Sequence, residues 1–284
     1  MSGVVLTDGA MGTELWRRGW DPSRPTALAV LEEPDTVLAI HRDYYRAGAR
    51  VLLTNTFVAN AGRLPGHVDV RSIQRAAVEL ADRASAARCR VLGDIGPLWD
   101  LLEPRGTLDE ERVKTIWSQQ ALALIEAGVS GLLVETLSGR REIELAAEAI
   151  RSLVPNAWLA TSVILRRDSE GRYLTLAGDP LSEVLAAWSA GGFDVVGFNC
   201  GELGLGDHVE AVRAARAAGL PRIWVRAGAG LTPECDPKAE APIDPEDYAL
   251  QIDDLLEAGA TWFGGCCGTR PAHIEALRQA LDAG

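Results

Sequence analysis

Two adjacent cysteines near the end of the chain are the residues whose type and spacing best suit chemistry. Cys266 and Cys267 follow the apolar run Thr261–Phe263 and stand between glycines. Neighbouring cysteines rarely pair with each other, because the ring would strain the peptide between them. Both thiolates can reach one metal ion, however, where glycine lets the backbone turn sharply. Cys200 ends a second apolar run, residues 194–199. Three sulfurs at the ends of two strands predict a zinc site whose fourth position is open, as catalysis requires.

Two alternatives to a catalytic zinc site are open at this point. The three cysteines could be ordinary buried residues that behave as small hydrophobic side chains. They could instead hold a closed structural site in a non-catalytic zinc-binding protein, which would need a fourth protein ligand. Cys235, in the polar segment 232–243, is the spare cysteine downstream of Cys200. A Cys235→Ala variant would lose zinc from a closed site and keep it in an open one.

The composition limits the classes of protein to which the chain can belong. Its 284 residues are 47% hydrophobic and 24% charged, as in ordinary globular proteins. A net charge of −12 argues against nucleic acid and anionic membrane surfaces as partners. No run approaches the ~20 apolar residues of a membrane span, and residues 1–3 lack the basic start of a signal peptide. Five cysteines, an odd number, predict free thiols in a reducing cytoplasm.

Short β-rich runs alternate with segments of helical length along the whole chain. The eight runs are residues 4–10, 50–57, 90–97, 131–137, 158–165, 194–201, 222–230 and 261–268. Several helical segments end in Ala-Gly before the next run, and glycine after the last turn is a common helix stop. Eight strands alternating with helices predict an α/β fold with one domain, residues 1–284, built as a (β/α)8 TIM barrel. An open, doubly wound sheet is the alternative.

In a TIM barrel the active site lies at the carboxyl ends of the strands. The runs end there in polar residues: Asp8, Asn55, Thr56, Asp94, Glu135, Thr136, Thr161, Ser162, Asn199, Cys200, Arg226, Cys266 and Cys267. The three cysteines therefore share one rim, which favours the zinc site over separate buried cysteines. The residues that we expect to contact substrate are Asp8, Asn55, Glu135, Thr136, Asn199 and Arg226. Trp16 and Trp99 could hold a cationic ligand by cation–π contact, although tryptophans more often pack in cores.

Several of these segments together resemble the zinc-dependent homocysteine S-methyltransferase family. They are Asp8–Leu15, Thr54–Phe57, Glu135-Thr136, Gly197–Cys200, Gly264–Thr269 and Pro271–Ile274. The resemblance runs from the first strand to the last helix and implies a (β/α)8 barrel with zinc on Cys200, Cys266 and Cys267. It also implies that Asp8 and Glu135 lie around the amino group of homocysteine.

The chain departs from the family pattern after the seventh strand. Ala227–Gly230 replaces the usual Pro-Asn-Ala-Gly, and Gly201 replaces a serine after the first zinc cysteine. Gly228 removes a polar side chain from the substrate rim, whereas Arg226 could bind a carboxylate in bidentate fashion or be a solvated surface residue. Some relatives methylate carbon in 2-oxo acids with S-adenosylmethionine, so this reaction is the alternative function.

The function that the resemblance implies is transfer of a methyl group to the thiol of homocysteine, which would serve methionine biosynthesis. Zinc would supply the charge that turns the acceptor thiol into a thiolate, and we expect the protein to orient it against the donor. We expect a small sulfonium donor, S-methylmethionine or S-adenosylmethionine. A donor carried by a corrinoid or folate module is not expected, because the sequence ends just after the last predicted helix.

Overall fold

Eight parallel strands form a ring at the centre of the computed structural model, which describes residues 3–98, 100–220, 222–231 and 241–283. The strands are β1 (Val5–Leu6), β2 (Val51–Leu53), β3 (Arg90–Ile95), β4 (Leu132–Leu137), β5 (Leu159–Val163), β8 (Val195–Asn199), β9 (Ile223–Arg226) and β10 (Trp262–Phe263). They are hydrogen-bonded in the order β1-β10-β9-β8-β5-β4-β3-β2. A parallel bridge between Thr7 and Val51 joins β1 to β2. The predicted barrel is therefore confirmed, and the open sheet is wrong.

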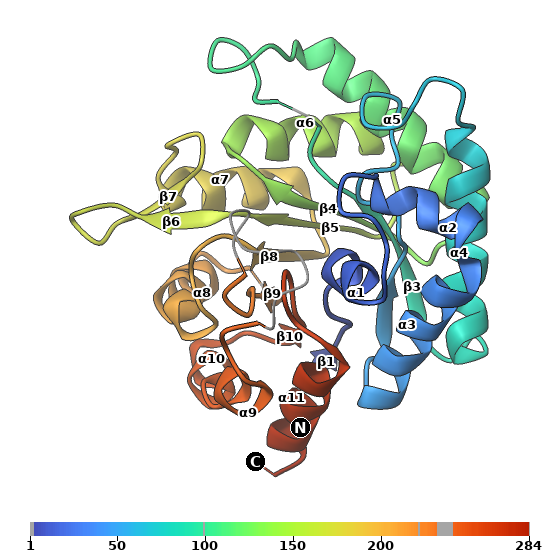
Figure 1. Ribbon diagram of the computed structural model, residues 1–284. Coiled ribbons are helices and arrows are strands. Elements are labelled where there is room, and N and C mark those ends of the chain that lie inside the picture. Colours follow the sequence, from blue (N-terminus) through green and yellow to red (C-terminus); the bar gives the residue numbers. More distant parts are fainter. Residues whose placement is uncertain (1–2, 99, 221, 232–240, 284) are drawn as a thin grey trace.

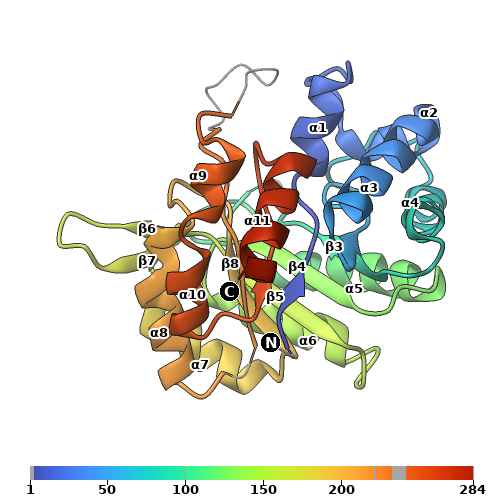
Figure 2. The same ribbon diagram turned by 90° about the horizontal axis from the view of Figure 1, so that it is seen from below.

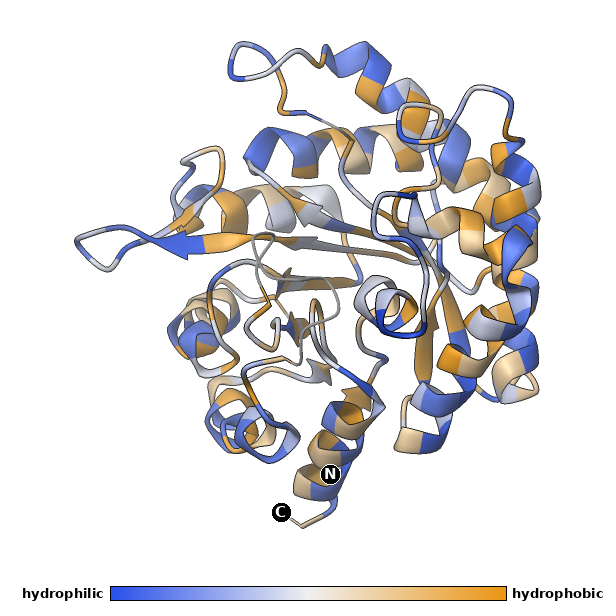
Figure 3. Ribbon diagram, in the orientation of Figure 1, coloured by the Kyte–Doolittle hydropathy of each residue, from blue (hydrophilic) through white to orange (hydrophobic). Residues whose placement is uncertain are grey.

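Helices pack around this ring, most of them on its outer side, whereas α1 (Met11–Arg17) lies at the rim where the strands end (Figures 1 and 2). The others are α2 (Ala29–Glu32), α3 (Pro34–Ala47), α4 (Val70–Ser85), α5 (Glu110–Glu126), α6 (Arg140–Arg151), α7 (Leu181–Gly191), α8 (Val209–Ala217), α9 (Pro245–Ala249), α10 (Ile252–Ala258) and α11 (Pro271–Ala283), with short 3-10 turns at Thr26–Leu28 and Gly206–His208. Aspartate side chains cap two of them: Asp69 accepts the Arg71 N–H before α4, and Asp109 accepts that of Arg112 before α5. Figure 3 shows hydrophobic and hydrophilic residues side by side on these helices, as expected where one face packs on the sheet.

The inside of the barrel is filled by side chains from the strands. Their cluster contains Val51, Leu53, Leu92, Leu133, Ala160, Val195, Trp224 and Trp262. Trp224 and Trp262 lie with ring centroids 5.3 Å apart. Most of these residues come from the first half of their strands, so they pack the amino end of the barrel interior. The polar strand ends are left facing the opposite rim, where TIM-barrel enzymes bind their substrates.

One element of the structure is not predicted by the sequence pattern. β6 (Leu165–Arg167) and β7 (Tyr173–Thr175) form an antiparallel hairpin that projects from the barrel in both views (Figures 1 and 2). Asp168 organises its turn by accepting the N–H groups of Glu170 and Arg172. In the described part of the chain, no helix is long and apolar enough to cross a membrane. Trp99 and Cys235, which the sequence singles out, lie outside the described residues.

Candidate metal centre and substrate cavity

The three predicted zinc ligands come together at the carboxyl rim of the barrel. Cys200 follows β8 directly, and Cys266 and Cys267 follow β10 after two glycines. Their sulfur atoms all lie within 4.8 Å of one another, and the Sγ atoms of Cys200 and Cys267 are 3.6 Å apart. No histidine, aspartate, glutamate or further cysteine joins this group among the residues that the structure describes. The cluster therefore offers a metal three thiolates and one open side.

The backbone around the cysteines turns in conformations that few residues adopt. Cys200 has a φ of 58° and Thr136, on the neighbouring rim, one of 66°. A side chain on Gly265 would collide with Thr269, whose hydroxyl donates to the carbonyl of Cys266 at 2.7 Å. Such strain persists only where the surroundings enforce it, and it is typical of functional sites.

The thiols share hydrogen bonds that separate their acidities. The hydrogen bond from Cys266, and to a smaller extent the one from Cys267, lowers the pKa of Cys200 to about 3, although burial acts in the opposite direction. The pKa of Cys266 is raised to about 12, first because its thiol bonds to Cys200. One sulfur of the cluster is thus prepared as a thiolate, the form in which cysteine binds metals.

Asn199 links the thiols to the acids of the site. Its amide oxygen accepts the Thr136 N–H at 3.1 Å and the Ser162 hydroxyl at 2.7 Å. Its amide nitrogen donates to the Thr136 hydroxyl at 2.8 Å and to the Glu135 carboxylate at 3.3 Å. Asn199 is fully buried and does not line the cavity, so it lies one layer behind the direct substrate contact that we expected. Its bonds fix the orientation of Glu135 and Thr136.

Three carboxyl groups and one guanidinium lie beside the thiols. Asp8, Asp94, Glu135 and Arg226 are each 3–5% exposed, and all four line one cavity. An Nη1 atom of Arg226 is bonded to the Glu135 carboxylate. The alternative that Arg226 is a solvated surface residue is therefore wrong. Sequence reasoning placed Asp94 at a strand end but did not count it as a site residue.

Burial is the main influence on the acidity of these carboxyl groups. It raises the pKa of Asp8 to about 7, although Arg226 opposes the shift. It also raises the pKa of Glu135 to about 7, again against Arg226. The pKa of Asp94 lies well above its usual range because of burial and then the charge of Glu135. Burial disfavours the charge of Arg226, but Glu135 and Asp8 outweigh it and raise its pKa. The three carboxyl groups thus outnumber the guanidinium of Arg226 beside them.

The cavity has a volume of about 460 Å³ and two kinds of wall. Its polar floor carries the four charged residues, and its other predicted members are Asn55, Thr136, Cys200, Cys266 and Cys267. Asn55 is held by a hydrogen bond of 2.9 Å to the carbonyl of Thr26. The apolar wall includes Met11 and Trp16 from α1, with Phe57, Val58 and Pro97. Arg63 also lines it, a residue that no motif in the sequence indicates. The cavity therefore joins the thiols to an acidic floor under an apolar wall.

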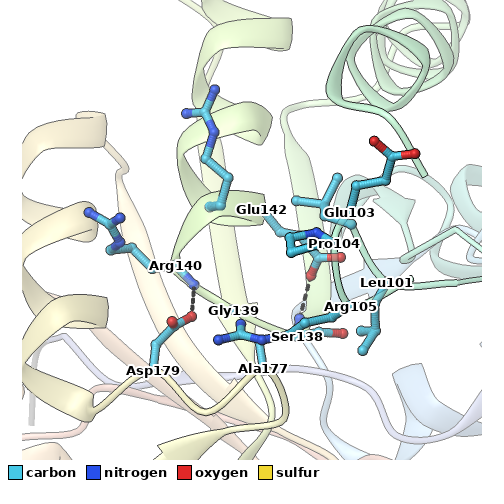
Figure 4. A pocket seen from close by; sticks show the side chains of 12 residues that line it. Leu101, Glu103, Pro104, Arg105, Ser138, Gly139, Arg140, Glu142, Ala177 and Asp179 are labelled. Atoms are coloured by element: carbon cyan, nitrogen blue, oxygen red, sulfur yellow. Dashed lines mark hydrogen bonds between the residues drawn. The ribbon is translucent and has the colours of Figure 1, made fainter. Parts of the chain in front are cut away.

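A second hollow, of about 200 Å³, opens where the segment 101–105 faces the start of α6 (Figure 4). Glu142 points at the backbone there and accepts the N–H of Ser138, and Asp179 accepts that of Arg140 at 2.7 Å. None of the predicted site residues lines this hollow. Its buried acid is satisfied by the loop itself.

Comparison with known proteins identifies the family. The sequence model of the homocysteine S-methyltransferase family matches residues 5–281. This chain belongs to that family. The resemblance predicted from its motifs is confirmed, and methyltransferase is the class of enzyme to which the family assigns it.

Relatives match the chain over almost its whole length. A homocysteine S-methyltransferase of Escherichia coli (strain K12) is 31% identical, over 97% of this chain and 94% of that protein. The methionine synthase of Mycobacterium tuberculosis (strain ATCC 25618 / H37Rv) is 30% identical over 98% of this chain, which spans only 24% of that longer enzyme. The metallated form of the homocysteine methyltransferase MmuM from Escherichia coli superimposes with a TM-score of 0.79 at 27% identity, over 98% of this chain and 96% of that one.

Proposed function

We propose that this protein is a zinc-dependent methyltransferase that methylates the thiol of homocysteine and so forms methionine. The convergence of Cys200, Cys266 and Cys267 on one side of an acidic cavity carries this proposal. A closed structural zinc site is less well supported, because the described residues supply three ligands and leave one side facing the cavity.

The cysteine cluster fits zinc in both chemistry and size. Zinc–sulfur bonds of about 2.3 Å in a tetrahedron place sulfur atoms about 3.8 Å apart. The distance of 3.6 Å between the sulfur atoms of Cys200 and Cys267 is close to that value. When bound, zinc would supply a positive charge that lowers the pKa of the acceptor thiol, so that it reacts as a thiolate. A reducing compartment such as the cytoplasm would keep the cysteines free to bind it.

The remaining residues orient the two substrates. Asp8 and Glu135 can accept hydrogen bonds from the ammonium group of homocysteine, which aligns its thiol with the cysteine cluster. Trp16, Phe57 and Val58 exclude water from the side on which the methyl donor would approach. Holding the thiol in line with the donor methyl group turns a bimolecular reaction into an effectively unimolecular one.

The charge of the cavity favours a cationic donor. Three carboxyl groups and the thiols outnumber Arg226 and Arg63, the two arginines of its lining. We therefore propose a small sulfonium donor, S-methylmethionine or S-adenosylmethionine. The alternative acceptor is a 2-oxo acid. The Nε atom of Arg226 is buried without a partner in the described part of the chain, and it could donate to the carboxylate of either acceptor.

A paired assay tests the proposal. Zinc-loaded protein is given S-methylmethionine or S-adenosylmethionine together with either L-homocysteine or 2-oxobutanoate, and products are followed by mass spectrometry in deuterated water. We expect methionine from homocysteine with at least one of the two donors and no added corrinoid. Methylation of the oxo acid, with deuterium uptake at its C3 and no methionine, would reverse the choice of acceptor. Turnover with methylcobalamin alone would reverse the choice of donor.

A further inference from the structure

Two buried carboxylate oxygens on the cavity floor lack a hydrogen-bond donor. Asp8 is 3% and Asp94 5% exposed, and the Oδ1 atom of each receives no hydrogen bond from the described part of the chain. The other oxygen of Asp8 accepts the Leu53 N–H at 2.7 Å, which fixes its carboxylate. A buried acceptor without a donor costs about 1–3 kcal/mol, and more when it is charged. Since both residues line the cavity, the missing donors are expected from a ligand.

The two aspartates stand on alternate strands of the barrel. Asp8 follows β1 and Asp94 belongs to β3, on either side of β2. The backbone N–H of Asp8 donates to Val51 at 3.1 Å, and that of Asp94 to the Thr54 hydroxyl at 3.0 Å. Alternate strands of a TIM barrel send side chains into a common layer of its interior. The two carboxyl groups are close enough to interact, because the charge of Asp8 adds to burial and to the charge of Glu135 in raising the pKa of Asp94.

Glu135 is the third acid of this floor, and it is already engaged. Its Oε2 atom accepts from both Arg226 and Asn199. One arginine and one amide therefore hold Glu135 in place, and its carboxyl group also shares a hydrogen bond with that of Asp94. The Oδ1 atoms of Asp8 and Asp94 are left without a donor among the described residues, so they can accept from a ligand. The arrangement offers three carboxyl groups to one small cation.

We propose that Asp94 is a third carboxylate for the ammonium group of the acceptor, beside Asp8 and Glu135, and that Arg226 is the positioning residue for this trio. The inference rests on the proposed function for the presence of an amino-acid acceptor. An ammonium group has three N–H donors, so each carboxylate can accept one. A 2-oxo acid carries no such donor and would leave the oxygens of Asp8 and Asp94 unsatisfied. Asp94 is thus a specificity-determining residue for an α-amino acid.

The electrostatics of the floor agree with this role. Three buried carboxylates repel one another, and the single positive charge of Arg226 cannot balance the three negative charges. The pKa of Asp94 is raised by burial and by the charge of Glu135, both of which disfavour its ionised form. A bound ammonium group would offset both effects, because it brings a positive charge and hydrogen bonds into the same layer.

Calorimetric titration of the zinc-loaded protein tests the assignment. L-homocysteine is compared with 4-mercaptobutanoate, which has the same thiol and carboxylate but no amino group. A charge-assisted hydrogen bond contributes roughly tenfold to 100-fold in affinity. We expect the wild type to prefer homocysteine by at least about tenfold, and Asp94→Asn to weaken homocysteine by roughly tenfold to 100-fold. The affinity for 4-mercaptobutanoate should stay within about twofold.

Each outcome of the titrations supports or overturns the assignment of Asp94. A wild type that binds both ligands equally, or neither, overturns the assignment, as does an equal loss for both ligands in Asp94→Asn. Asp94→Ser is the second variant if Asp94→Asn does not fold. Asp168→Asn, in the turn of the β6–β7 hairpin, is the matched control and should bind like the wild type. Selective binding of homocysteine without methylation by any donor would reject the proposed reaction and leave the role of Asp94 intact.

Discussion

Two hollows open beside neighbouring loops of the barrel, and each contains a buried glutamate. Glu135 lies in the substrate cavity and Glu142 in the smaller hollow of Figure 4. Burial raises the pKa of both carboxyl groups to about 7. By exposure and acidity alone the two residues cannot be told apart.

Their partners distinguish them. Glu142 accepts the backbone N–H of Ser138, four positions earlier, and so fastens the loop before α6. Glu135 pairs with Arg226, 91 positions later, across the interior of the barrel. Around Glu135, one oxygen of Asp8 and one of Asp94 lack a donor among the described residues, whereas Glu142 and Asp179 in the smaller hollow accept backbone N–H groups. A ligand site is therefore indicated by what is left unsatisfied near a buried acid, and not by the shifted pKa itself.

Removal of one thiol of the cluster should have the largest effect on activity, and the change should be confined to the substrate cavity. Cys266→Ser takes one of three sulfurs from the cluster, so zinc content should fall from about one per chain to near zero. Methyl transfer should fall by about 10³-fold or more, since the metal supplies several kcal/mol of stabilisation. Atomic absorption and a methionine assay measure the two effects. Cys89→Ser, at a buried cysteine whose thiol donates to the Ala49 carbonyl and is not part of the cluster, should keep its zinc. Full zinc content in Cys266→Ser would refute the three-thiolate site.

The arginines of the two hollows offer a second contrast. Arg226→Gln leaves three buried carboxyl groups without a positive partner, which should lower the free energy of unfolding by about 3–5 kcal/mol. Arg141 in the smaller hollow pairs with Glu110, Glu144 and Glu148 at the surface, so Arg141→Gln should cost about 0–1 kcal/mol. Urea denaturation compares the two. The double variant Asp94→Asn/Arg226→Gln should recover part of the loss, because it removes one of the stranded charges. If the losses in free energy of unfolding of the two single variants simply add up in the double variant, Arg226 and Asp94 are not coupled.

The sequence predicts the barrel and the cysteine cluster because both follow from local pattern. Apolar runs alternate with helical segments, and Cys200, Cys266 and Cys267 stand directly after two such runs. The carboxyl ends of parallel strands must meet at one rim, so the spacing along the chain hardly matters. The hairpin β6–β7 escaped prediction because its strands are only three residues long and half of their residues are polar.

The layering of the cavity could not be predicted in the same way. Whether a polar strand end faces the cavity, as Asp94 does, or lies behind its wall, as Asn199 does, depends on strand register and depth. The pairing of Arg226 with Glu135 joins two strands that are not neighbours in the sheet. No periodicity in the sequence records such a contact.

Matched substitutions of the two glutamates test the comparison most directly. Glu135→Gln removes the charge that we propose orients the acceptor, so the KM for homocysteine should rise roughly tenfold to 100-fold. Glu142→Gln makes the same chemical change in the first turn of α6, outside the substrate cavity, and KM and kcat should stay within about twofold. Steady-state kinetics with a saturating donor measure both. Equal losses of activity in the two variants would mean that the smaller hollow also takes part in catalysis.

The smallest effect concerns the pH dependence of stability. Glu142 has a folded-state pKa of about 7 against a usual value of 4.5, so between these values the folded protein binds more protons than the unfolded chain. Its contribution to the free energy of unfolding must therefore fall as pH rises from about 5 to 7, by up to about 1.4 kcal/mol per pH unit. Glu142→Gln removes this titration, so its stability should decline less steeply than that of the wild type in urea denaturation across this range. Glu110→Gln, at a half-exposed residue whose pKa is lowered by its bond to Arg141, should run parallel to the wild type, because Glu110 is ionised throughout. If the stability of Glu142→Gln changes with pH in parallel with that of the wild type, Glu142 is already ionised at pH 5. Glu135 and Glu142 would then differ in acidity as well as in partners.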